Sequence, residues 1–116
     1  MRIAIYGKGG IGKSTITANI AAALADKGNR VLQIGCDPKQ DSTRLLLKGK
    51  RILAARDYLR DQRLSEILCE GYKGVVCAEA GCPEPLSRDA RPCVFTLIWF
   101  QSLLRWKRFF KNVIIF

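Results

Sequence analysis

Residues 7–15 of this 116-residue chain read Gly-Lys-Gly-Gly-Ile-Gly-Lys-Ser-Thr. The stretch fits the phosphate-binding pattern G-x-x-x-x-G-K-[ST], in which glycines let successive backbone N–H groups turn toward a phosphate. A short apolar run at residues 3–6 precedes it, and apolar residues at helical spacing, Ile16, Ile20, Ala23 and Leu24, follow it. A strand, a glycine loop and a helix in this order favour a phosphate-binding loop over a chance glycine turn.

The residue types in this loop predict a chemistry for individual positions. Lys13 would reach the β- and γ-phosphates of a nucleotide, and the Ser14 hydroxyl would ligate Mg²⁺. The start of the following helix adds partial positive charge that favours an anion. We therefore predict a site for ATP and Mg²⁺. The predicted nucleotide-binding residues are Gly7, Lys8, Gly9, Gly10, Ile11, Gly12, Lys13, Ser14 and Thr15.

A second strand is predicted at residues 30–35, after Gly28, which fits a helix C-cap, so that residues 3–35 form a βαβ unit. Residues at the carboxyl end of a parallel strand face a ligand crevice. Asp37 and Asp41 follow this strand, and a carboxylate there can orient water or hold a Mg²⁺-bound water. Loop or helix capping by the same aspartates fits equally well, so the residues alone leave both interpretations open.

Lys8 and the segment after the second strand carry a resemblance to a known family. The additional lysine at position 8 resembles the deviant Walker A loop of dimeric ATPases, among them the nitrogenase iron protein and the chromosome-partitioning ATPases. Residues 35–39, Gly-Cys-Asp-Pro-Lys, and residues 41–43, Asp-Ser-Thr, resemble the nitrogenase iron protein family and its relatives in tetrapyrrole synthesis. The resemblance resumes at residues 70–81 and 83–85.

This resemblance implies a P-loop α/β fold with a parallel sheet. It also implies a homodimer that hydrolyses MgATP and passes electrons from a shared [4Fe–4S] cluster to a catalytic reductase partner, as in nitrogen fixation. Lys8 would reach across the dimer interface, although a solvated loop cation is the alternative. Asp37 and Asp41 would belong to the first switch region and join Lys8 and Lys13 as the catalytic set. Cys36 would be a buried thiol.

The family pattern breaks at residues 86–93. In the family, the segment after Pro-Glu-Pro holds the cysteine that ligates the cluster, and here that position falls on Asp89. Because register is kept on both sides, two compensating frameshifts or sequencing errors would explain the break. Cys93 is the remaining candidate ligand, and it could serve only if the loop were remodelled. A [4Fe–4S] cluster is therefore doubtful in this chain, and Cys77 is expected to be buried in a strand.

We interpret residues 1–116 as the N-terminal part of one P-loop ATPase domain, because full-length family members are well over twice as long. Residues 1–85 are family-like, residues 86–93 diverge, and residues 94–116 are partly family-like. Further strands are predicted at residues 75–78 and 113–116, and we expect the latter to be an exposed sheet edge. Between the family-like blocks, residues 52–68 predict one or two short amphipathic helices.

The net charge is +10, and half of this excess lies in residues 86–116, which hold six basic residues and one acidic residue. The basic and aromatic segment 99–110 could contact nucleic acid, but we favour a helix with an unpartnered apolar face. We therefore predict no nucleic-acid partner. The longest apolar candidate, residues 94–104, is too short to span a bilayer. The five cysteines follow no secretory signal, so we expect a reduced, cytoplasmic protein without a membrane span.

Two alternative functions stay open at this point. A partitioning-type ATPase would explain the glycine loop and the basic charge, but members of that class usually have Asp-Pro-Gln where this chain has Cys-Asp-Pro-Lys at residues 36–39. The other alternative is a non-functional fragment that retains at most nucleotide binding.

Overall fold

A computed structural model describes residues 1–36, 39, 42–52, 67–80 and 112–115 of the chain. Its elements are β1 (Arg2–Ala4), α1 (Lys13–Asp26), β2 (Val31–Gly35), β3 (Cys69–Glu70), the 3-10 helix η2 (Tyr72–Gly74), β4 (Val76–Glu79) and β5 (Asn112–Ile115). The strand–loop–helix–strand start of the chain confirms the order predicted from the sequence. The helices predicted at residues 52–68 lie almost wholly outside the described residues.

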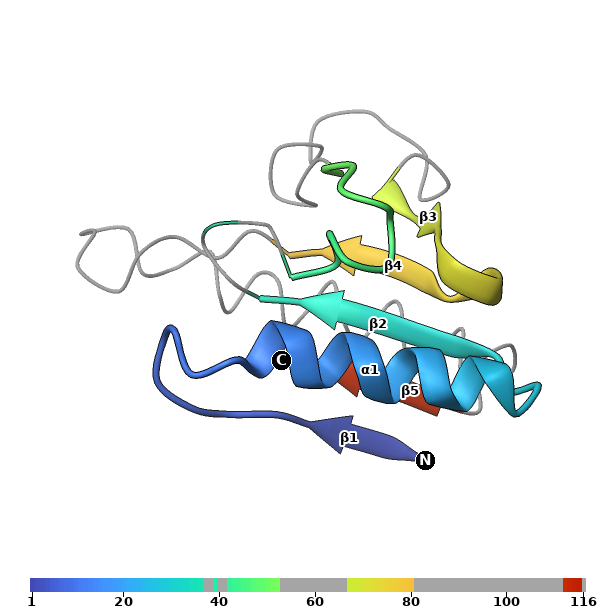
Figure 1. Ribbon diagram of the computed structural model, residues 1–116, viewed down its shortest axis with the longest axis horizontal. Coiled ribbons are helices and arrows are strands. Elements are labelled where there is room, and N and C mark those ends of the chain that lie inside the picture. Colours follow the sequence, from blue (N-terminus) through green and yellow to red (C-terminus); the bar gives the residue numbers. More distant parts are fainter. Residues whose placement is uncertain (37–38, 40–41, 53–66, 81–111, 116) are drawn as a thin grey trace.

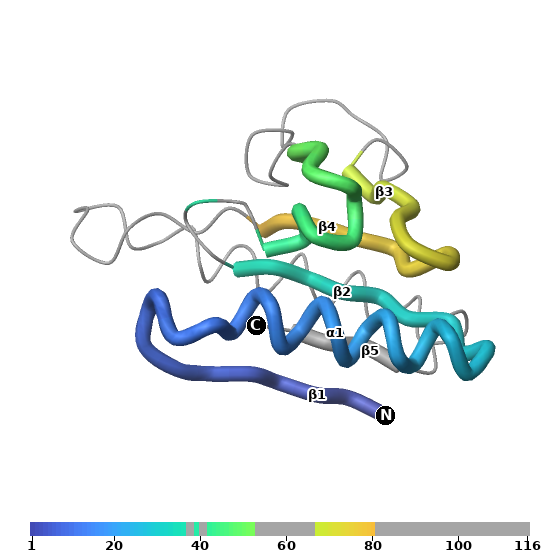
Figure 2. Tube along the Cα trace, in the orientation of Figure 1, coloured from blue at the N-terminus to red at the C-terminus, as the bar shows by residue number. Residues whose placement is uncertain are grey.

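The five strands form one sheet in the order β1-β5-β2-β4-β3 (Figure 1). Four of them are parallel, and β3 alone runs antiparallel, paired with β4. The carboxyl ends of β1, β2 and β4 therefore lie at one edge of the sheet, where the loop that leads into α1 also lies (Figures 1 and 2). This arrangement confirms the predicted α/β fold with a mainly parallel sheet.

The prediction that residues 113–116 form an exposed sheet edge is wrong. β5 lies inside the sheet, where it pairs with β1 through Ile3 and Ile114 and with β2 through Gln33 and Ile114. A run of Val and Ile is typical of a parallel strand with neighbours on both sides. The expectation failed because the β1–α1–β2 unit leaves a gap between its two strands, and the last strand fills it.

Small residues on one stripe of α1 attach the helix to the sheet. Thr17, Ala18, Ala21 and Ala25 are its buried residues, at a spacing that keeps them on one helical face. The apolar positions noted in the sequence lie beside this stripe rather than on it, and Ile16 is 54% exposed. Alanine side chains are short, so the helix axis can approach the strands closely.

The two faces of the sheet hold separate apolar clusters, because successive strand residues point to opposite sides. On one face, Val31 and Cys77 pack in the cluster that includes the alanines of α1, together with Leu46 and Leu47. On the other face, a smaller cluster contains Leu32, Ile34 and Ala78. Register sets Gln33 beside Cys77 and Gly35 beside Glu79, so these four residues lie on the helix-bearing face.

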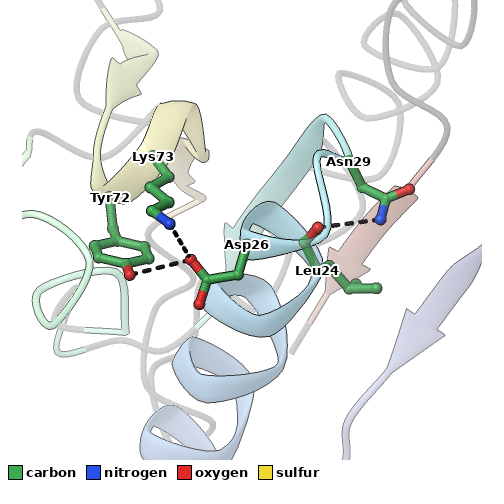
Figure 3. Close-up of polar contacts among 5 residues, drawn as sticks. All are labelled: Leu24, Asp26, Asn29, Tyr72 and Lys73. Atoms are coloured by element: carbon green, nitrogen blue, oxygen red, sulfur yellow. Dashed lines mark hydrogen bonds and ion pairs between the residues drawn. The ribbon is translucent and has the colours of Figure 1, made fainter.

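The C-terminal end of α1 follows a Schellman motif and confirms the predicted C-cap. Gly28 has φ +79°, a conformation that glycine adopts without steric cost. Its N–H donates to Ala25 O at 2.9 Å, and the N–H of Asn29 donates to Leu24 O at 3.1 Å. The Asn29 side-chain amide donates to the same Leu24 carbonyl at 3.1 Å (Figure 3).

An exposed polar contact joins the last turn of α1 to η2 (Figure 3). Lys73 Nζ lies 2.8 Å from Asp26 Oδ1, and the Tyr72 hydroxyl donates to the same oxygen at 3.1 Å. The hydrogen bond from Lys73 is the main reason why the pKa of Asp26 lies below its usual value of 3.8, and the pKa of Lys73 is correspondingly raised.

Within the described residues, no helix is long and apolar enough to cross a bilayer.

Asp26→Asn should lower the thermal midpoint slightly at neutral pH, because exposed ion pairs contribute little to stability. Since folding lowers the Asp26 pKa, this contribution is present above pH 3.8 and is lost as the pH falls through the folded-state pKa. Thermal unfolding of both proteins at pH 7 and near pH 3 would measure the difference, with Glu70→Gln, at an exposed residue of β3, as a charge-matched control. A difference that grows on acidification would contradict this assignment.

Candidate nucleotide-binding site

The glycine loop connects the carboxyl end of β1 to the start of α1. Gly12 is the N-cap residue, with φ +93° and no side-chain cap, and Gly10 also has a positive φ of +80°. The first helical hydrogen bond runs from Ile16 N to Gly12 O at 3.0 Å. The N–H groups of residues 13–15 therefore precede the helical hydrogen-bond ladder, which is the arrangement that binds anions at helix N-termini.

Lys13 folds back over this loop. Its Nζ donates to the carbonyl oxygen of Lys8 at 2.7 Å, so the ammonium group lies beside the loop backbone. A Cβ added at Gly9, Gly10 or Gly12 would meet no atom within 4 Å, so side chains do not crowd these three positions. The loop thus combines backbone donors, a helix N-terminus and an ammonium group, which together suit a phosphate chain.

Gly7 has the opposite environment. Its φ of +158° is a backbone conformation that other residues rarely adopt, and a Cβ there would also displace the exposed Ile11 side chain, whose Cδ1 would lie 2.6 Å away. Ser14 is half-buried in the first turn of α1, whereas Lys8, Ile11 and Thr15 are exposed. The nine predicted nucleotide-binding residues are consecutive and all described, and their binding roles stay predictions. Asp37 and Asp41 lie outside the described residues, and their predicted roles stay predictions.

One buried acidic residue at the carboxyl end of the sheet, with two hydroxyl residues around it, was not predicted from the sequence. Glu79, which follows the predicted strand 75–78, is the last residue of β4 and is 1% exposed. Its Oε1 accepts hydrogen bonds from the Thr43 backbone N–H at 2.8 Å, from Thr43 Oγ1 at 2.9 Å and from Ser42 Oγ. The available signal was the alternation Val-Cys-Ala-Glu in residues 76–79, which sets Glu79 on the same face as Cys77.

The described cysteines do not form a metal site. Cys77 is fully buried, as predicted, and desolvation raises the pKa of its thiol to about 12, with smaller contributions from Cys69 and Glu79. Metal ligation needs a thiolate, which burial disfavours here. Cys36, expected to be buried, is only half-buried, because it follows β2 at the edge of the sheet. Asp89 and Cys93 lie outside the described residues.

A parallel α/β sheet with a glycine-lysine loop between its first strand and first helix defines the class of P-loop nucleoside triphosphatases. The kinase domain of Escherichia coli tyrosine kinase ETK superposes with a TM-score of 0.74 at 19% identity, covering 98% of this chain and 45% of that one. Cobyrinic acid a,c-diamide synthase from Mycobacterium smegmatis, solved with an ATP analog and magnesium, superposes with a TM-score of 0.67 at 28% identity. The alignment covers 98% of this chain and 49% of the synthase chain.

The family within this class follows from the sequence match. A model of the 4Fe-4S iron sulfur cluster binding proteins of the NifH/frxC family matches residues 1–106, and the chain belongs to this family. It is 47% identical to a nitrogenase iron protein of Methanospirillum hungatei over 99% of this chain and 42% of that protein. It is 46% identical to nitrogenase iron protein 2 of Paenibacillus durus over 97% of this chain and 38% of that protein. The chain thus spans about two-fifths of the length of these relatives, and the predicted family resemblance is confirmed.

Alkylation of the folded chain at pH 8 should modify Cys77 more slowly than Cys69 by at least about tenfold, because only a thiolate attacks iodoacetamide. Burial keeps Cys77 protonated, whereas Cys69 is half-buried at the sheet edge. Mass spectrometry of timed digests would give both rates, and labelling in denaturant, where the rates should converge, is the control. Equal rates in the folded chain would contradict the burial of Cys77.

Proposed function

We propose that this chain binds MgATP in the loop of residues 7–15 and represents the nucleotide-binding part of a nitrogenase-reductase-like protein of the cytoplasm. In the intact protein, ATP hydrolysis by a homodimer would drive electron transfer from a [4Fe–4S] cluster to a catalytic reductase partner. The observation that carries the nucleotide proposal is the position of the Lys13 ammonium over the glycine loop, 2.7 Å from Lys8 O. Membership of the family supports the electron-transfer proposal.

Within this proposal, Lys13 and Ser14 of the loop and the two aspartates after β2 have distinct roles. The backbone N–H groups at the start of α1 and the Lys13 ammonium bind the β- and γ-phosphates, and the Ser14 hydroxyl ligates Mg²⁺. Asp37 and Asp41, which follow β2, orient water around the metal as parts of the first switch. The diamide synthase solved with an ATP analog and magnesium supports this assignment, because its fold superposes on nearly the whole chain.

Lys8 supports the proposal of a homodimer. Its side chain is exposed on the loop, and its carbonyl is the group that Lys13 contacts. An exposed cation beside a nucleotide site can reach the phosphates held by a second subunit, which would link dimer formation to nucleotide binding. In such a dimer, Lys8 of each subunit would complete the nucleotide site of the other subunit, so the two sites would be equivalent.

The residues of this chain are poorly suited to hold a [4Fe–4S] cluster. Iron–sulfur clusters are held by cysteine thiolates, whereas the family ligand position falls on Asp89. In the described part of the chain, no group of three or more Cys, Asp or Glu side chains could hold a metal ion. We therefore derive no redox step for these 116 residues, and the electron-transfer proposal concerns the intact relatives with a complete ligand set.

Lys13→Met should weaken MgATP binding by about 100-fold, because it removes a charged hydrogen-bond donor from the phosphate site. Lys27→Met is the matched control, since Lys27 is exposed at the far end of the same helix and should bind MgATP as the unchanged chain does. Titration calorimetry with the 116-residue chain gives both affinities.

The same measurement separates the proposal from its alternatives. A folded chain that binds no MgATP would identify a non-functional fragment and overturn the proposal. Equal weakening by both substitutions would show that general charge, rather than the loop, attracts the nucleotide. Salt-sensitive DNA binding without iron in a full-length, in-frame version would favour a partitioning-type ATPase instead.

A further inference from the structure

We infer that Glu79 is a positioning residue, which fixes the turn at Ser42 and Thr43 to the carboxyl edge of the sheet, directly after the predicted switch residue Asp41 in the sequence. The inference rests on the proposed function in one respect, because Asp41 is a predicted switch carboxylate of the nucleotide site. The fixation of Ser42 and Thr43 by Glu79 is independent of any nucleotide.

This one turn donates three hydrogen bonds to Glu79. Oε1 accepts from the Thr43 backbone N–H at 2.8 Å, from Thr43 Oγ1 at 2.9 Å and from Ser42 Oγ. All three residues are buried, with exposures between 0 and 2%. A buried carboxyl group needs hydrogen-bond partners that replace water. The turn supplies those partners, so Glu79 and the turn hold each other in place.

The neighbouring strand β2 holds the same turn from a second direction. The Gln33 side-chain amide, which is fully buried, donates to Ser42 O at 3.2 Å. Gly35, on the same strand, leaves the space that Ser42 and Glu79 occupy, because a Cβ on Gly35 would overlap Ser42 Oγ and lie 2.8 Å from Glu79 Cδ. Glycine at the end of β2 is therefore required by the close approach of Ser42 and Glu79.

The chain after the turn is also fixed. The N–H groups of Leu46 and Leu47 donate to Thr43 O at 3.1 and 3.2 Å, and both leucines pack in the main apolar cluster. The N–H of Tyr72 donates to Leu46 O at 3.0 Å. The segment that begins at Ser42 is thus anchored to β2, β4 and η2. Asp41, which lies outside the described residues, directly precedes this segment in the sequence.

Outer residues that orient the groups around a metal typically change metal affinity by 10–100-fold when they are replaced. Glu79→Gln keeps the shape of the side chain but replaces one carboxyl oxygen by an amide NH2 group, which donates and cannot accept. Glu70→Gln makes the same chemical change at an exposed residue of β3 and is the matched control.

Amide hydrogen exchange of the 116-residue chain without nucleotide tests the fixation itself. We expect the Thr43 amide to exchange at least about tenfold faster in Glu79→Gln, because its acceptor is weakened, while amides in the middle of α1 keep their protection. Glu70→Gln should change neither. An unchanged Thr43 exchange rate in folded Glu79→Gln would overturn the inference. Should that variant fail to fold, Ser42→Ala, which removes one donor, should likewise accelerate Thr43 exchange, and no acceleration would overturn the inference.

ATP affinity with and without Mg²⁺ tests the consequence for the site. Glu79→Gln should reduce the gain in affinity that Mg²⁺ provides by about tenfold and leave the affinity in EDTA unchanged. A purely structural role for Glu79 would lower both affinities alike, and that result would overturn the positioning role. Failure of the unchanged chain to bind MgATP would contradict the proposed function alone, because the exchange experiment decides the fixation without nucleotide.

Discussion

The pairing of β5 with β1 on one side and β2 on the other is the interaction on which the nucleotide loop depends. Among the described residues, β1 has β5 as its only neighbour in the sheet, through Arg2, Ile3 and Ala4. β1 is the element that leads into the glycine loop, so the strand nearest the C-terminus fixes the start of that loop. Bringing these distant segments together costs chain entropy, which the hydrogen bonds of two parallel ladders and the apolar strand sequences must offset.

Neutral groups contact both Lys13 and Glu79 near the carboxyl ends of the strands. Lys13 donates to the carbonyl of Lys8, and Glu79 accepts from the hydroxyl and amide donors of Ser42 and Thr43. Because Lys13 donates to a neutral carbonyl, its ammonium group can exchange this partner for a phosphate. Direct ion pairing of Lys13 with a carboxylate would compete with such a ligand.

Local features of the site were predictable from the sequence because local spacing determines them. The glycine loop, the helix after it, the C-cap at Gly28 and the strand of Cys77 each follow from a pattern within a few residues. The position of β5 and the two-residue strand β3 did not, since strand order depends on pairing between distant segments. The alternation in residues 76–79 sets Glu79 on the face of Cys77, but its contacts with Ser42 and Thr43 join segments that are distant in the sequence, and no local pattern specifies them.

The stripe of α1 that packs on the sheet shows the same limit within a single helix. The larger apolar residues suggested one face, but Ala18, Ala21 and Ala25 form the buried one. Close packing against the sheet selects small side chains, and hydrophobicity alone does not reveal how near the strands lie.

The most direct test of this account is the MgATP affinity of Ile114→Pro measured beside that of Ile114→Val. Proline in a strand with neighbours on both sides removes a backbone donor and disrupts the ladder, whereas valine preserves it. We predict that Ile114→Pro loses MgATP binding and that Ile114→Val retains it. Unchanged MgATP affinity in Ile114→Pro would contradict the claim that β5 holds the nucleotide loop in the sheet.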